Sequence, residues 1–170
     1  MYEIPYTLSE LTVCVGAKAG PRRHDLVSRR LRHWGSTGVL QTVGALHVGT
    51  GRSRRFGTEE AYLGALLIRL ADWGLSIGAL KAIAEAIRSE NAKGGEMAAL
   101  WREAKQPGFG FDPVFAGLSV ELDDAAERPV SVGIRLARGK RLNTPSFYLD
   151  RWDSMMVLNL TEIFVGVTLL

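Results

Sequence analysis

Apolar residues recur at helical spacing in five stretches of the first 105 residues, and this periodicity predicts five helices. The stretches are residues 7–15, 22–35, 58–73, 76–88 and 96–105. In the second stretch, Leu26, Val27, Leu31 and Trp34 mark the predicted buried side, and arginines occupy the other faces.

Residues that favour helix starts stand at the beginning of these stretches. Thr7 and Glu10 have the capping-box spacing, in which each side chain accepts a hydrogen bond from the other residue's backbone N–H. Pro21 suits the first position of the second helix, because the N–H that it lacks would be unsatisfied there. Thr58 and Ser76 are the expected N-caps of the third and fourth helices.

Residues 38–56 have a different pattern, which predicts a β-hairpin. Residues 39–40 and 43–48 are mostly apolar and are predicted to be extended, and Gly49-Thr50-Gly51 is typical of a turn. Residues 52–56 alternate as a returning strand would. The arginines beside the turn would give this hairpin a basic tip.

The last third of the chain mixes strand and helix signals. Gly94-Gly95 is the expected domain boundary, and Pro107 to Gly110 interrupts the helical pattern after it. Residues 118–122, 130–136, 147–149 and 155–160 predict strands. Thr161 is the expected cap of a short terminal helix.

The excess of positive over negative charge is confined to the first third of the chain. Residues 1–57 carry nine Lys/Arg against three Asp/Glu, a net charge of +6, whereas residues 58–90 have −2 and residues 91–170 have −1. A basic segment of this kind either forms a solvated surface or binds an anionic partner such as nucleic acid. The order helix, turn, arginine-rich helix and basic hairpin favours duplex DNA, because a helix fits the major groove and a hairpin can follow the backbone.

Four motifs within residues 6–88 resemble the MerR family of winged helix-turn-helix transcription regulators. Residues 32–40 are similar to its signature of arginine, any residue, an aromatic, a polar pair and Gly-Leu-Leu. Arg54-Arg55-Phe56 is similar to the Arg-x-Tyr that closes the family's wing. Residues 70–81 resemble the run that joins its last two helices, and residues 6–11 resemble the start of its first. All four motifs stand in the family's order.

The resemblance implies a dimeric DNA-binding regulator in which Arg32, Trp34 and Arg54 contact the DNA backbone. Charge adds six further candidates, of which Arg29 is the expected base contact because it lies in the middle of the helix. These six are Arg22, Arg23, Arg29, Arg30, Arg52 and Arg55. Trp34 fits a core position as well as a contact position.

The chain also departs from the family. Residues 17–25 form an insertion where the family has a tight turn, Gly35 stands where glutamate is frequent, and the loop of residues 41–51 is long. The family's long dimer helix would be limited here to about ten residues by Gly94-Gly95 and Pro107. We therefore expect the C-terminal part to share in dimerisation with that helix or to replace it, for example by pairing residues 130–136.

The expected architecture is a mostly α N-terminal winged helix-turn-helix of four helices with a β-hairpin wing, followed by a small α+β C-terminal domain. The expected divisions are a DNA-binding domain at residues 1–90, a linker helix at 91–106 and a dimerisation or effector domain at 107–170.

Other chemistry is weakly represented in the sequence. The lone Cys14 is expected to be a small buried residue, Tyr62 and Trp73 are expected in the core, and the three histidines lack ligand spacing. No cofactor, metal site or catalytic motif is predicted, and the expected location is cytoplasmic and nucleoid-associated.

Three functions remain open at this point. The first is a sequence-specific transcription regulator that binds duplex DNA as a homodimer and receives a small-molecule or protein signal through residues 107–170. The second is a DNA-architectural, excisionase-type factor without an effector. The third is an enzyme in which the DNA-binding part is an accessory. The first function agrees with the charge pattern and with the resemblance and is the one expected, so the protein is not expected to be an enzyme.

Overall fold

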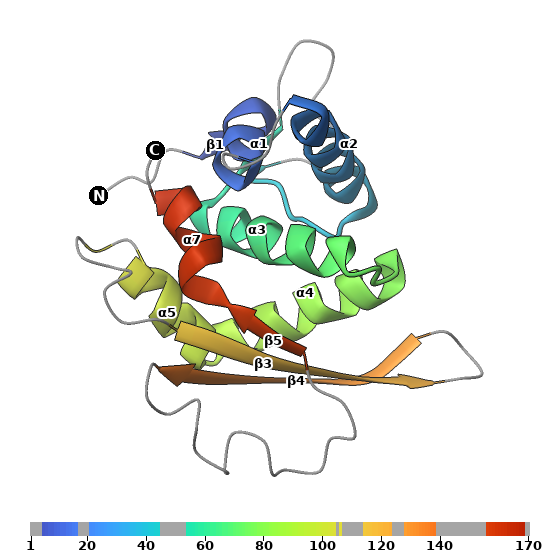
Figure 1. The fold of residues 1–170 in the computed structure, drawn as a ribbon, viewed down its shortest axis with the longest axis vertical. Coiled ribbons are helices and arrows are strands. Elements are labelled where there is room, and N and C mark those ends of the chain that lie inside the picture. The colour runs from blue at the N-terminus through green and yellow to red at the C-terminus, as the bar shows by residue number, and fades with distance from the viewer. Residues whose placement is uncertain are drawn as a thin grey trace. The chain divides into compact units, whose positions relative to one another are not determined.

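A computed structural model of the protein describes residues 5–16, 21–44, 54–104, 106, 114–123, 128–138 and 156–168. Most of these residues are helical, and the strands among them form one two-stranded and one three-stranded antiparallel sheet (Figure 1). The chain divides into two compact units, residues 1–75 with 166–170 and residues 76–165. The division follows Leu75, whereas the sequence places its boundary near residue 90.

The first unit contains three helices and a two-stranded ribbon among its described residues. Strand β1 (Tyr6–Thr7) leads directly into α1 (Leu8–Gly16), and α2 (Pro21–Thr37) follows. Strand β2 (Arg55–Phe56) pairs antiparallel with β1 and precedes α3 (Thr58–Asp72). Helix α1 packs against both α2 and α3 (Figure 1).

The start of α1 is the capping box that the sequence predicts. The Thr7 N–H donates to Glu10 Oε2 at 2.7 Å, and the Glu10 N–H donates to Thr7 Oγ1 at 3.3 Å. The cap expected for α3 is wrong. Gly57 occupies the N-cap position in extended conformation without a side-chain hydrogen bond, and Thr58 is the first helical residue.

The core of the first unit is built from apolar residues of its helices, although Leu26, on the predicted buried side of the second helix, is 38% exposed. Leu11, Leu31, Leu63 and Leu67 are fully buried, and burial of each stabilises the fold by about 1.5–3 kcal/mol. Tyr62 is buried as expected. The same expectation for Trp73 is wrong, because its side chain is 52% exposed. Trp73 caps the C-terminus of α3 and therefore lies beyond the last helical turn that the core covers.

The second unit combines helices with an antiparallel sheet. Ser76 caps α4 (Ile77–Ala92) by accepting a hydrogen bond from the Ala79 N–H at 3.3 Å, as the sequence predicts. Helix α5 (Glu96–Ala104) packs against α4. Strands β3 (Val114–Asp123), β4 (Arg128–Arg138) and β5 (Met156–Asn159) form a sheet with β3 in the centre, and α4 packs against β4 (Figure 1).

The terminal helix α7 (Leu160–Thr168) starts differently from the prediction. Thr161 is not its cap. Its Oγ1 instead accepts a hydrogen bond from the Val114 N–H at 2.7 Å, in the buried interior of the second unit. The amide oxygen of Asn159 accepts from the Glu162 N–H and so satisfies the first turn of α7. The strand predicted at residues 147–149 lies outside the described residues.

Candidate nucleic-acid interface

Helix α2 presents one buried face and one exposed face. Val27, Leu31 and Trp34 are buried at spacings of four and three residues, which places them on one side of the helix. The Trp34 side chain is 3% exposed, which favours a packing role over the DNA contact considered for it. An α-helix turns by about 100° per residue, so Arg29 lies roughly opposite the middle of this buried stripe.

The exposed side of α2 carries Arg29, Arg32 and His33, which we call the outer face. The Arg29 Nε–H donates to the Asp25 carbonyl one turn earlier, at 3.4 Å. Arg32 makes no hydrogen bond or ion pair to any other residue that the structure describes. A guanidinium keeps its charge at all physiological pH values and offers five N–H donors. The outer face therefore holds two permanent positive charges with most of their donors directed to solvent.

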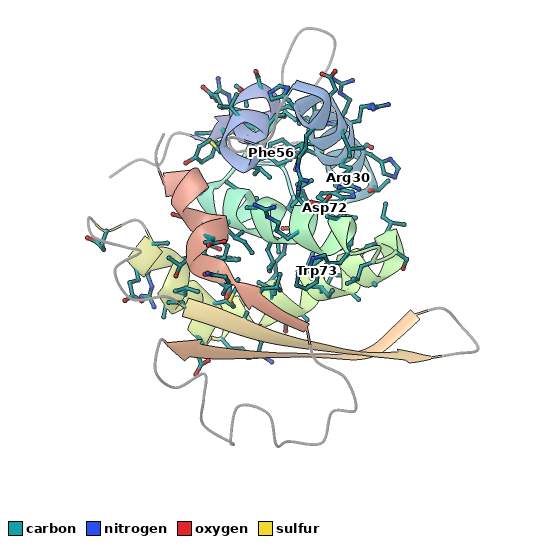
Figure 2. The ribbon with its side chains drawn as sticks, viewed as in Figure 1. Arg30, Phe56, Asp72 and Trp73 are labelled. Atoms are coloured by element: carbon teal, nitrogen blue, oxygen red, sulfur yellow. The ribbon has the colours of Figure 1, made fainter. Side chains whose placement is uncertain are left out.

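Two other arginines of α2 are bound by one carboxylate, and Figure 2 labels one of them, Arg30, together with Asp72. Asp72, the last residue of α3, accepts from Arg30 Nη1 at 2.7 Å through Oδ1 and from Arg23 Nη2 through Oδ2. We call this group of three residues the Asp72 clamp. The side chains of Asp72 and Arg30 are 24% and 26% exposed and are partly shielded from water, whereas the Arg23 side chain is 42% exposed. The clamp ties α2 to the C-terminal end of α3.

The base of the predicted wing packs closely on the C-terminal part of α2. Gly35 faces the Phe56 ring, and a Cβ built at residue 35 would lie 3.1 Å from Phe56 Cζ and 4.0 Å from Arg54 Nη1. The Val43 N–H donates to the Arg55 carbonyl at 2.8 Å. Arg55 Nη1 also donates to the Pro5 carbonyl at 3.3 Å. The chain is thus held at both ends of the segment in which the hairpin is predicted, while residues 45–53 lie outside the described residues.

The predicted contact residues are therefore separated into groups. Arg29 and Arg32 lie on the outer face, Arg54 and Arg55 lie at the start of β2, and Arg23 and Arg30 belong to the Asp72 clamp. The side chain of Arg22 and the whole of Arg52 lie outside what the structure describes. The sequence analysis missed Asp72, which stands 42 and 49 residues from its two partners. No local pattern links residues at such separations.

Other kinds of site find little support in the part of the chain that the structure describes. No three His, Cys, Asp or Glu side chains come together there in a way that could hold a metal ion. Cys14 is buried as expected, and burial raises the pKa of its thiol to about 11. None of the described helices is both long and apolar enough to cross a bilayer.

Comparison with protein-family models and with curated proteins found no match for this chain.

Proposed function

We propose that the protein is a duplex-DNA-binding transcription regulator whose first unit acts as a winged helix-turn-helix. In this proposal α2 enters the major groove, and Arg54 and Arg55 contact phosphates from the base of the wing. A homodimer would place two copies of α2 on a pseudo-palindromic site.

The observation that carries the proposal is the outer face of α2. Arg29 and Arg32 project from a helix whose opposite side is anchored by Val27, Leu31 and Trp34, so the charges have a fixed direction. Arginine can donate two parallel hydrogen bonds to a guanine edge or to a phosphate, which suits both base readout and backbone contact. The resemblance of residues 6–88 to MerR regulators supports the same role.

The proposal is tested by comparing two arginine variants that differ only in position. Arg29 and Arg102 are both exposed, and each donates its Nε–H to the carbonyl four residues earlier, at 3.4 and 3.3 Å. Arg102 lies on α5, in the second unit, and does not belong to the outer face of α2. Arg29→Ala should therefore weaken DNA binding, whereas Arg102→Ala should leave it unchanged.

Fluorescence anisotropy with a labelled duplex, measured from roughly 50 to 200 mM salt, gives the slope of log affinity against log salt. Loss of one phosphate contact should flatten this slope by about 0.9. Binding that is absent or independent of salt in the unmodified protein would refute the proposal. Equal affinities together with equal slopes for the Arg29 and Arg102 variants would refute the role of the outer face, because loss of a base contact lowers the affinity and loss of a phosphate contact lowers the slope.

A further inference from the structure

The Asp72 clamp lies on the flank of α2 rather than on its outer face. Arg30 and Arg23 stand one residue after and six residues before Arg29, which places both about 100–120° from it around the helix, on the same side. Arg23 and Arg30 lie next to the buried stripe that contains Val27 and Trp34. They therefore face the C-terminal end of α3, where Asp72 accepts their hydrogen bonds. Each carboxylate oxygen accepts from one of the two guanidiniums.

Asp72 makes the guanidiniums of Arg23 and Arg30 less available to bind a polyanion. A phosphate that approaches Arg30 must displace a charge-assisted hydrogen bond of 2.7 Å, and it is also repelled by the carboxylate. The three groups together carry a net charge of +1 instead of the +2 of the two free arginines. Because Asp72 and Arg30 are only about one-quarter exposed, solvent screens this interaction less than it would a fully exposed pair.

We infer that Asp72 limits sequence-independent DNA binding by holding Arg23 and Arg30 away from the phosphates. The inference rests on the proposed function of the outer face. Phosphate contacts supply affinity without sequence information, whereas base contacts supply specificity. Two unrestrained arginines beside the outer face would add affinity for any duplex. The clamp therefore raises the share of the binding free energy that depends on base sequence.

The first test replaces Asp72 by asparagine, which keeps the size of the side chain and removes its charge. Binding of a mixed-sequence duplex, about three helical turns long, is followed by anisotropy from roughly 50 to 200 mM salt. If both released arginines reach phosphates, the salt slope of Asp72→Asn should steepen by about 1–2. Adding Arg23→Gln and Arg30→Gln to this variant should restore the original slope.

Glu59→Gln is the matched control for net charge. Glu59 lies on the same helix, is exposed, and has no ion pair among the described residues. It should leave the slope unchanged, because it releases no arginine. A slope for Asp72→Asn that equals the Glu59→Gln slope would overturn the inference, and so would loss of binding by a folded Asp72→Asn protein.

A second test leaves Asp72 in place. The double variant Arg23→Gln/Arg30→Gln should keep the wild-type slope, because neither arginine contacts phosphate while the clamp is closed. A slope flattened by about 1–2 would show that both arginines already bind DNA and would overturn the inference. The unmodified protein is titrated in the same way as a control. If it binds DNA with a clear salt dependence, the variants test the inference alone. If it does not bind, the proposed function fails, and the inference fails with it.

Discussion

Replacement of Gly35 by alanine tests the close packing of Phe56 on α2. Gly35 lies in a helix and does not have a positive φ, so alanine can adopt its backbone conformation. Helix propensity alone would stabilise the variant by about 1 kcal/mol. The added Cβ, however, would lie 3.1 Å from Phe56 Cζ and 3.4 Å from Cε1. These distances are shorter than the ordinary van der Waals separation of carbon atoms.

Phe56 has little freedom to move away from the new methyl group. Its side chain is 1% exposed, and its strand pairs with β1 through the partners Tyr6 and Phe56. Overpacking at a site of this kind costs about 1–3 kcal/mol. The gain in helix propensity offsets part of that cost, so Gly35→Ala should lower the free energy of unfolding by up to about 2 kcal/mol.

Gly64 provides a matched control, because it is also a buried helical glycine of the first unit. A Cβ at residue 64 would lie 3.5 Å from Leu31 Cδ2 and 3.6 Å from Leu40 Cδ1, which are ordinary contacts. Gly64→Ala should therefore raise the free energy of unfolding by about 1 kcal/mol. Urea titrations monitored by tryptophan fluorescence would measure both variants.

The additional variant Phe56→Leu separates the clash from other effects. Leucine lacks the ring atoms nearest to residue 35, so Gly35→Ala should cost less in the Phe56→Leu background than in the wild type. The difference is the coupling free energy of a double-mutant cycle. A Gly35→Ala protein as stable as the Gly64→Ala protein, or an absence of coupling with Phe56→Leu, would refute this account of the packing.

Two further predictions concern ionisable groups of the first unit. Burial raises the pKa of the Cys14 thiol to about 11, so iodoacetamide should alkylate Cys14 slowly in the folded protein at neutral pH and rapidly in urea. Mass spectrometry measures the extent of alkylation over time, and rapid alkylation of the folded protein would contradict this prediction. The hydrogen bond from the Thr7 N–H lowers the pKa of Glu10, so its ionised form stabilises the folded state above the usual glutamate pKa, and this contribution is lost as the pH falls through the lowered value. Glu10→Gln should therefore be less stable than the wild type at neutral pH, with a smaller difference in acid, and thermal unfolding at several pH values would show whether the two curves converge.

Local signals in the sequence predicted the helix starts that depend on neighbouring residues. The Thr7–Glu10 box and the Ser76 cap each join positions three residues apart, so their spacing is visible in the chain itself. The cap of α3 was missed because Thr58 has suitable chemistry but Gly57 precedes it and takes the extended position. Thr161 was misassigned for a different reason, since its partner Val114 comes from a strand 47 residues away.

The pairing of β2 shows a similar limit. The alternation of residues 52–56 predicted a strand at the correct place, and the described part of it is Arg55–Phe56. Strand β2 pairs with Tyr6–Thr7, a partner that the sequence did not predict. From the segment predicted as its hairpin partner, the Val43 N–H donates to the Arg55 carbonyl, and residues 45–53 lie outside the described residues. Two residues of strand contain too little pattern to specify a partner almost 50 positions away. The packing of Gly35 against Phe56 depends on that pairing and could not be predicted without it.

The charge of α2 also has to be interpreted through its geometry. Counting arginines treats Arg23, Arg29, Arg30 and Arg32 as equivalent parts of one basic segment. In the folded first unit, Arg23 and Arg30 share one carboxylate on α3, whereas Arg29 and Arg32 lie on the exposed outer face. A shift of one residue along the helix, from Arg29 to Arg30, corresponds to about 100° of rotation and separates a solvent-directed guanidinium from one that is hydrogen-bonded to a carboxylate. Under the proposed function, α2 would therefore neutralise fewer phosphates than its composition suggests, and the salt slope of DNA binding would measure that number.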